Sequence, residues 1–160
     1  MELIVQRIGP REGEVIADLG AGIGYLSIPL ADEGAKVIAL DFQQEMLDGL
    51  RERDNGLERI VLVRTKLPEV PLPDSSLDRV VMVNVFHEVE DKARLVSEIS
   101  RVLRPEGRVS LVDWQARETE RGPPPHERVP MDQAPSYFPG FVLEREYDDP
   151  NYYHLELRRR

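Results

Sequence analysis

The sequence contains no cysteine, which excludes disulfide bonds, zinc sites built from thiolates, and thiol nucleophiles. It has no run of about 18 consecutive apolar residues, so no membrane-spanning helix is expected. The first residues, MELIVQRIGPREGE, carry a charge inside a short apolar stretch, which argues against a secretory signal peptide. These absences together favour a cytoplasmic protein.

Basic residues are scarcer than acidic ones. Lysine and arginine together number 21, against 30 aspartates and glutamates, which gives a formal net charge of −9. A surface of this charge repels a phosphate backbone unless a local basic face is present. The charge balance therefore argues against a nucleic-acid partner.

The size of the chain is that of one domain. A length of 160 residues with 41% hydrophobic residues is typical of a single globular unit. We find no internal repeat and no linker, so we expect one domain over residues 1–160. No metal site is predicted.

Short β-branched runs alternate with longer amphipathic stretches, which predicts parallel strands joined by crossover helices. Pro29 lies inside the first amphipathic stretch and predicts a bend or a locally loosened turn near Tyr25. Asn55-Gly56 and Arg104–Gly107 are expected to end the second and third helices. The expected strands are Glu14–Gly20, Lys36–Asp41, Arg59–Arg64, Asp78–Asn84 and Arg108–Trp114, and the expected helices are about Ile23–Asp32, Gln43–Arg53 and Asp91–Leu103.

The C-terminal part departs from this alternation. A long irregular stretch reaches to about Pro139 and contains Gly122-Pro123-Pro124-Pro125, so we expect either a lid or a mobile loop. Phe141–Tyr147 and Tyr152–Arg158 then alternate like two strands around a turn signal. The predicted fold class is α/β, with a mostly parallel sheet closed by a C-terminal antiparallel hairpin.

A glycine-rich turn, Asp18-Leu19-Gly20-Ala21-Gly22, stands where the first strand ends and a helix follows. Open parallel sheets bind ligands outside the carboxyl ends of their strands, and glycine lets a ligand approach the backbone closely. Asp41 ends the second strand, at about the spacing from the turn at which an acid accepts the hydroxyls of a ribose. The two features predict an adenosine-type ligand.

The nature of that ligand follows from charge. A dinucleotide site should have its third glycine where this chain has Tyr25, and Asp18 would bring a negative charge near a pyrophosphate. A carboxylate beside the turn suits a ligand with a cationic amine instead. S-adenosylmethionine carries an ammonium, a sulfonium and a ribose, so it is the cofactor we predict.

Several motifs in register resemble the class I S-adenosylmethionine-dependent methyltransferases, particularly the small-molecule branch that includes quinone-biosynthesis C-methyltransferases. The resemblance covers roughly Glu14 to Arg158. It implies a Rossmann-like doubly wound sheet and methyl transfer to a small-molecule acceptor by in-line displacement. The motifs that carry it are VIADLGAGIG, VIALDFQQEML, PLPDSSLDRVVMVNVFHEVED, LRPEGRVSLVDW and GPPPHERV.

The resemblance also implies roles for individual residues. It places Asp18, Gly20 and Gly22 around the methionine part of the cofactor and Asp41 on the ribose. It further places Phe42 against the adenine and the backbone of Asn84 near the sulfonium.

The chain departs from the family pattern in two places. Many relatives have an acid after the third strand to accept the adenine amine, whereas this chain has Lys66, so Thr65 or the Leu67 backbone would have to substitute. Many relatives also carry helices over the acceptor, whereas only residues 1–13 precede the first strand here. The acceptor pocket is then open or completed by another subunit, which makes a homo-oligomer possible.

An acceptor that is a hydroxyl or a carbon acid needs a base, and His87 just beyond the fourth strand is the candidate, followed by Glu88. Both residues could instead pack or cap the next helix. His126 would reach the site only if the proline-rich loop closed over it. Asp113–Trp114 line either the acceptor side or a core edge, and His154 is interpreted as an ordinary hairpin residue.

Two other functions fit parts of the pattern. A glycine turn followed by a distant acid also occurs in NAD(P)-dependent oxidoreductases. The short N-terminal segment and Lys66 would fit a subunit that binds S-adenosylmethionine without catalysis. Binding of the two cofactors would discriminate among these hypotheses.

Overall fold

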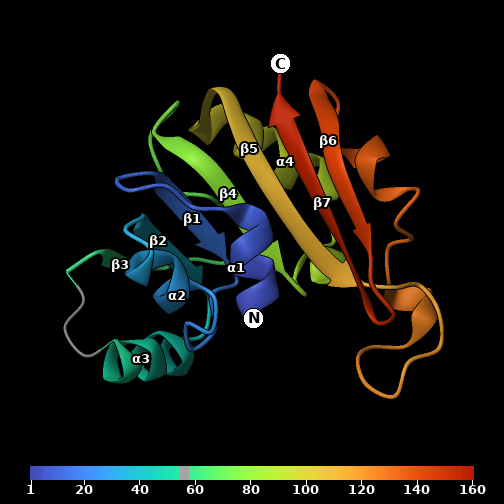
Figure 1. Cartoon of the computed structure of the whole chain (residues 1–160), viewed down its shortest axis with the longest axis horizontal. Coiled ribbons are helices and arrows are strands. Elements are labelled where there is room, and N and C mark those ends of the chain that lie inside the picture. The colour runs from blue at the N-terminus through green and yellow to red at the C-terminus, as the bar shows by residue number, and fades with distance from the viewer. Residues whose placement is uncertain (55–57) are drawn as a thin grey trace.

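A computed structural model, which describes residues 1–54 and 58–160, shows a seven-stranded sheet with helices on its two faces (Figure 1). The strands are β1 (Val15–Leu19), β2 (Lys36–Asp41), β3 (Ile60–Arg64), β4 (Leu77–Val83), β5 (Leu103–Trp114), β6 (Phe141–Asp148) and β7 (Tyr152–Arg159). The helices are α1 (Glu2–Ile8), α2 (Ser27–Asp32), α3 (Gln44–Arg53) and α4 (Lys92–Val102), with 3-10 turns η1 (Phe86–Glu88), η2 (Pro125–Glu127) and η3 (Ala134–Tyr137).

The sheet has the strand order β3-β2-β1-β4-β5-β7-β6. Strands β1 to β5 pair in parallel, while β7 runs antiparallel to both β5 and β6. The chain therefore starts in the middle of the sheet, winds outward to β3, returns past β1 to β4, and finishes with a hairpin. This topology confirms the expected α/β class, a Rossmann-like doubly wound sheet with a C-terminal antiparallel hairpin.

Helices cover both faces of the sheet (Figure 1). Val5 of α1 and Leu30 of α2 pack with Ile16 of β1 on one face. Leu95 and Ile99 of α4 belong to a larger buried cluster on the other face. Because both faces are covered, the central strands have near-continuous apolar sequences, which is why they were predicted well.

Helix α2 is shorter than the sequence predicted. It begins at Ser27, not at Ile23, so Pro29 falls in its first turn, where the missing N–H would have no helical partner in any case. The predicted bend of a helix near Tyr25 is therefore absent, because Tyr25 lies before α2, whereas the alternative of a loosened turn agrees with the turns found there. Residues 23–26 form turns outside the helix, held in part by the Gly24 N–H, which donates to the Ala21 carbonyl at 3.0 Å.

Two other boundaries differ from the prediction. Helix α4 ends at Val102, next to the predicted stop at residues 104–107, but strand β5 begins directly at Leu103 and not at Arg108. These residues form an irregularity in the pairing with β4, where Glu106 has φ +64° and the register shifts, and this bulge accommodates Pro105. Helix α1 was not predicted, and Asn55-Gly56, expected to end α3, lies outside the described residues.

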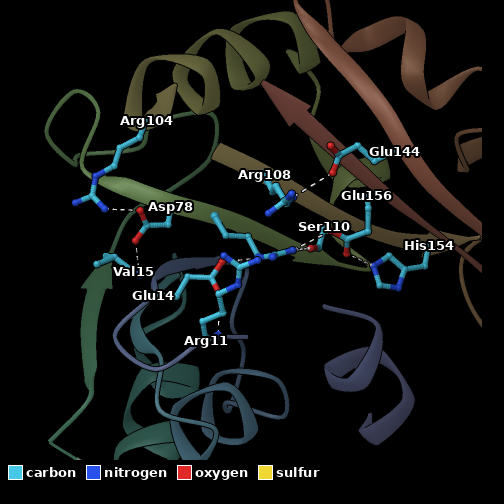
Figure 2. Close-up of polar contacts among 11 residues, drawn as sticks. Arg11, Glu14, Val15, Asp78, Arg104, Arg108, Ser110, Glu144, His154 and Glu156 are labelled. Carbon is cyan, nitrogen blue, oxygen red and sulfur yellow. Dashed lines mark hydrogen bonds and ion pairs between the residues drawn. The ribbon is translucent and has the colours of Figure 1, made fainter. Parts of the chain in front are cut away.

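A buried ion network joins strands that are far apart in the sequence (Figure 2). The Arg79 guanidinium donates to Glu14 at 2.9 Å, to Glu156 at 2.8 Å and to the Ser110 hydroxyl at 3.0 Å. His154, expected to be an ordinary hairpin residue, is buried with its Nε2 2.7 Å from Glu156. Removing one partner of such a buried pair costs about 3–5 kcal/mol, so the network ties β4, β5 and β7 to the segment before β1.

Candidate functional site

The bend after β1 lies at the carboxyl edge of the sheet, next to the point where the strand order reverses between β1 and β4. Gly20 and Ala21 donate their N–H groups to the Leu40 carbonyl at 2.8 and 3.0 Å, which holds the bend across the end of β2. Gly20 has φ +76°, and a Cβ there would lie 2.3 Å from Cγ2 of Val85. Glycine is therefore required at this position, because Val85 occupies the space that a side chain would need.

Asp41 ends β2 beside this bend. One carboxylate oxygen accepts the Gly22 N–H at 2.9 Å, and the other accepts the Gln43 N–H at 2.9 Å. A carboxylate has about four acceptor positions, so Asp41 keeps the capacity to accept two more donors. The pair of hydroxyls on a ribose matches that capacity.

Asp18 lies beneath the bend, with only 2% of its surface exposed. Its Oδ2 accepts the Ser27 hydroxyl at 2.6 Å, which ties β1 to the first turn of α2. Burial raises the pKa of Asp18 to about 6, against the lowering effect of the Ser27 hydrogen bond, and the nearby Asp41 charge raises it further. A buried carboxylate of this kind favours a positively charged ligand nearby.

A cavity of about 760 Å³ opens beside these groups. Five residues that the sequence assigned to the cofactor line it: Gly20, Gly22, Asp41, Phe42 and Leu67. Asp18, which is buried below the bend, and Asn84, directly after β4, are not among the lining residues. The volume lies within the range of small-molecule and cofactor sites, roughly 300–1,000 Å³. The other lining residues are Leu40, Gln43, Met46, Thr65, Lys66, Pro68, Glu69, Val85, Glu88, Val89, Glu90 and Asp91.

The segment after β3 forms one wall of the cavity. Lys66 is exposed there, and the Thr65 hydroxyl donates to the Glu69 carbonyl at 3.1 Å. This bond uses the hydroxyl hydrogen and leaves the oxygen lone pairs of Thr65 as acceptors, so Thr65 and the backbone near Leu67 both remain candidates to accept from the adenine amine.

Met46 and Val85 line the cavity although the sequence did not assign them to it. In a helix over residues 43–53, the spacing of Met46, Leu47 and Leu50 predicts that all three share one apolar face. Met46 lies one position before buried Leu47 and faces the cavity instead of the core. Helical spacing alone did not separate the edge of an apolar face from its centre.

His87 lies in η1, the turn that follows β4. Its N–H donates to Oδ2 of Asp113 at 2.9 Å, and its Nδ1 lies 2.7 Å from Oδ1 of the same carboxylate. The imidazole is largely buried, and its Nε2 lies 3.8 Å from Oε1 of Glu88. The structure thus joins His87 to Asp113, two residues that the sequence did not connect. His87 itself is not among the residues that line the cavity, whereas Val85 and Glu88 on either side of it are.

Asn84 also has an unusual environment at the end of β4. Its backbone has φ +57°, and its N–H donates to the Val112 carbonyl at 2.9 Å. Its Oδ1 is buried and has no hydrogen-bond partner among the residues that the structure describes. An unpaired buried amide oxygen of this kind is available to a ligand or to water.

The proline-rich loop is organised around Arg128 and does not cover the cavity. The Arg128 guanidinium donates to the carbonyls of Pro123 at 2.7 Å, Gln115 at 2.9 Å and Arg117 at 3.0 Å, and it lies 5.3 Å from the Trp114 ring. None of residues 115–139, all of which are described, lines the cavity. His126 is exposed in this loop, so in this structure the loop is no lid over the cavity.

Metal and membrane features were searched over the described ranges. Residues 1–54 and 58–160 contain no group of three or more histidine, aspartate or glutamate side chains arranged to hold a metal ion. None of the helices in those ranges has the length and hydrophobicity that a bilayer crossing requires.

Comparison with known proteins gives consistent matches. The family model described as a methyltransferase domain matches residues 17–111. An uncharacterized methyltransferase of Mycobacterium tuberculosis is 41% identical over 113 residues, which are 71% of this chain and 44% of that protein. A demethylmenaquinone methyltransferase of Clavibacter sepedonicus is 36% identical over 107 residues, which are 67% of this chain and 44% of that protein.

Solved structures match over almost the whole chain. A SAM dependent methyltransferase from Aquifex aeolicus aligns with a TM-score of 0.88 and 27% sequence identity, over 99% of this chain and 89% of that chain. A putative type 11 methyltransferase from Sulfolobus solfataricus aligns with a TM-score of 0.81 and 28% identity, over 99% of this chain and 90% of that chain. The chain spans less than half the length of the curated relatives above, at 44%.

Proposed function

This chain belongs to the methyltransferase domain family and has the fold of the class I S-adenosylmethionine-dependent methyltransferases, and we propose that it transfers a methyl group from that cofactor to a small-molecule acceptor. The family assignment agrees with the cofactor that the charge pattern predicted. The observation that carries the proposal is the cavity at the point where the strand order reverses, lined by the glycine bend and Asp41.

The residues present fit S-adenosylmethionine. Asp41 has free acceptor capacity for the ribose hydroxyls, and the backbone at Gly22 is open, because no atom lies within 4 Å of where its Cβ would be. Phe42, which is 53% exposed, and Met46 offer apolar surface for the adenine. When bound, the cofactor supplies a methyl group activated by a sulfonium.

The protein's part in the reaction is to bind, orient and exclude water. An acceptor that must lose a proton needs a base as well, and we assign this role to His87. Asp113 accepts from the His87 backbone N–H and bonds its Nδ1, which leaves Nε2 to take the proton. Asp113 is then a positioning residue, because it acts through the imidazole.

A small-molecule acceptor is supported by one relative and by the cavity. The relative from Clavibacter sepedonicus is named a demethylmenaquinone methyltransferase, and its name specifies a quinone-type acceptor for that protein. The 760 Å³ cavity leaves room beside a nucleoside for a group of modest size. A phenol or an enolisable carbon acid would use the base at His87.

The test begins with calorimetry of the purified chain against S-adenosylmethionine and NADH. We expect binding of S-adenosylmethionine alone. Binding of NADH with rejection of S-adenosylmethionine would favour the oxidoreductase hypothesis instead. Release of S-adenosylhomocysteine is then measured with a panel of quinols, phenols and amines, and release with none of a broad panel would favour the non-catalytic subunit.

The base is tested by His87→Gln with His126→Gln as the matched control, since the latter histidine is exposed in the loop. Loss of a general base typically costs about 10²–10⁴-fold in turnover. We expect that loss for the first variant, with cofactor affinity unchanged, and no effect for the second. A normal rate for His87→Gln would return His87 to a packing role.

A further inference from the structure

The turn that carries His87 is too short to define its own shape. Turn η1 has three residues, with one hydrogen bond from the Glu88 N–H to the Val85 carbonyl at 3.0 Å and one from the Val89 N–H to the Phe86 carbonyl at 3.3 Å. A single 3-10 turn has weak hydrogen-bond geometry and is rarely stable alone. Groups outside the turn must therefore hold it.

Two sets of contacts hold the first part of the turn. Asp113 of β5 holds His87 itself. The Phe86 side chain is fully buried, with its ring centroid 5.6 Å from that of Tyr137 and 5.4 Å from that of Phe138. These contacts fix the start of the turn, but they leave its carbonyl end unsupported.

Lys92 supports the carbonyl end. Its Nζ donates to the Val89 carbonyl at 2.7 Å and to the His87 carbonyl at 3.3 Å, and it lies 5.6 Å from the centroid of the Phe86 ring. The last carbonyls of a helical turn have no partner within the turn, and a cation satisfies them well. One ammonium group therefore closes the turn at the carbonyl of His87 and at that of Val89.

The backbone of Lys92 belongs to helix α4, which anchors the side chain. Lys92 is the first residue of α4, whose N-cap Asp91 accepts the Arg94 N–H at 2.9 Å. Burial lowers the pKa of Lys92, and the nearby Asp113 charge partly opposes this. The ammonium is thus partly removed from water, where its hydrogen bonds to carbonyls count for more than they would at the surface.

We propose that Lys92 is a positioning residue for His87, which holds η1 against α4 so that the imidazole keeps its hydrogen bond to Asp113. This inference rests on the proposed role of His87 for its importance in methyl transfer. The hold of Lys92 on the imidazole does not depend on that role, because it can be measured in the absence of cofactor and acceptor. The side chain of Lys92 does not line the cavity and acts through η1.

The experiment compares Lys92→Met, Lys92→Arg and Lys36→Met in the full chain. Lys36 is exposed in β2, so its replacement removes the same charge far from η1. The readout is the nuclear magnetic resonance signal of the His87 ring N–H that faces Asp113, assigned by its disappearance in His87→Gln. Urea unfolding and calorimetry with S-adenosylmethionine accompany it as checks on folding and on the cofactor site.

We expect Lys92→Met to broaden or abolish the His87 ring signal, with cofactor affinity within about twofold of the parent. Lys92→Arg should restore the signal, because a guanidinium also donates to carbonyls, and Lys36→Met should leave it unchanged. An unshifted, sharp signal in a folded Lys92→Met variant would overturn the inference. If Lys92→Met does not fold, the test falls to Lys92→Arg. Loss of the His87 ring signal in a folded Lys92→Arg variant would overturn the inference, because it would show that hydrogen bonds from a cation at position 92 do not suffice to hold the turn.

Methyl transfer separates this inference from the proposed function. With an acceptor found by the screen above, Lys92→Met should lower kcat and leave the cofactor Kd unchanged. A lost ring signal with undiminished kcat would support the hold on His87 and refute its role as the base.

Discussion

Replacing Asp18 with asparagine should stabilise the protein at neutral pH and weaken its binding of S-adenosylmethionine. Asp18 is almost fully buried, and its hydrogen bond from Ser27 asks only for an acceptor oxygen, which asparagine keeps. The variant removes the charge while retaining the shape. It therefore separates the electrostatic cost of the carboxylate from its packing.

The size of the effect follows from the pKa of Asp18. Burial raises that pKa from 3.8 to about 6, so the folded protein holds the proton more tightly than the unfolded chain does. At about 1.4 kcal/mol for each tenfold change in proton affinity, this difference is worth about 3 kcal/mol. For a chain of this length the gain corresponds to roughly 6–12 °C in Tm.

The sign of the pH dependence is definite. The wild-type chain has the full benefit of the protonated Asp18 below about pH 4, loses it as the pH rises to about 6, and has lost all of it above that. The asparagine side chain does not titrate, so the Asp18→Asn variant lacks this loss. The difference between the two free energies of unfolding should therefore grow between about pH 4 and pH 6 and then stay constant.

Urea unfolding of the two proteins from about pH 4 to pH 8 measures this difference. Other titrating groups, such as Glu98 and Asp149 with their lowered pKa values, affect both proteins equally and cancel. Asp32→Asn, at an exposed position of α2, is the matched control and should show no such curve. A difference that is flat across this range, or that favours the wild type at neutral pH, would refute the reasoning.

The functional half of the prediction concerns the cofactor. S-adenosylmethionine carries a net positive charge, and Asp18 lies close enough to Asp41 for the two charges to interact. Asp18→Asn should weaken cofactor affinity roughly tenfold, as measured by calorimetry above the pKa of Asp18. Equal or tighter binding would show that the buried carboxylate contributes nothing to recognition of the cation.

Two further predictions concern the bend and its neighbour. Asp41→Ala should weaken the binding of S-adenosylmethionine about tenfold or more by calorimetry, because it removes the ribose acceptor and leaves the Gly22 and Gln43 N–H groups without their partner. Asp48→Ala on exposed α3 is the control, and an unchanged Kd for Asp41→Ala would mean that the ribose is held elsewhere. Gly20→Ala should lower the free energy of unfolding by roughly 2–4 kcal/mol, because its Cβ would meet Val85 and its φ is +76°. Adding Val85→Ala should recover part of this loss in urea unfolding. No recovery would show that the clash with Val85 does not cause the loss.

The sequence predicted the centre of the fold better than its edges. Buried β-branched runs such as residues 36–41 can only be strands between covered faces, and the structure has β2 at those residues. The start of α2 and the start of β5 were missed because both depend on proline in context. Pro29 is harmless in a first turn, and Pro105 is harmless in a bulge, and neither setting can be known before the neighbouring strands are placed.

The candidate site likewise has features that the sequence predicted and features that it did not. The bend at Gly20 and the acid at Asp41 belong to local motifs, and the structure brings both to one cavity. The pairing of His87 with Asp113 joins residues 26 positions apart in sequence, from two strand ends whose adjacency depends on the strand order. The contacts of Lys92 with the carbonyls of η1 left no signal in the sequence, because they depend on the exact turn of the backbone.

The position of β7 has a consequence for synthesis of the chain. The ribosome delivers residues in order, yet β7 is made after the other six strands of the sheet and pairs on both sides, with β5 and with β6. Until Glu156 emerges, Arg79 lacks one of its two carboxylates and β6 has no neighbour among the residues already made. A nascent chain ending at the hairpin turn would thus expose a charged interior and an unpaired edge, so the sheet should close only once β7 has been made, and chaperone contact should concentrate on that interval.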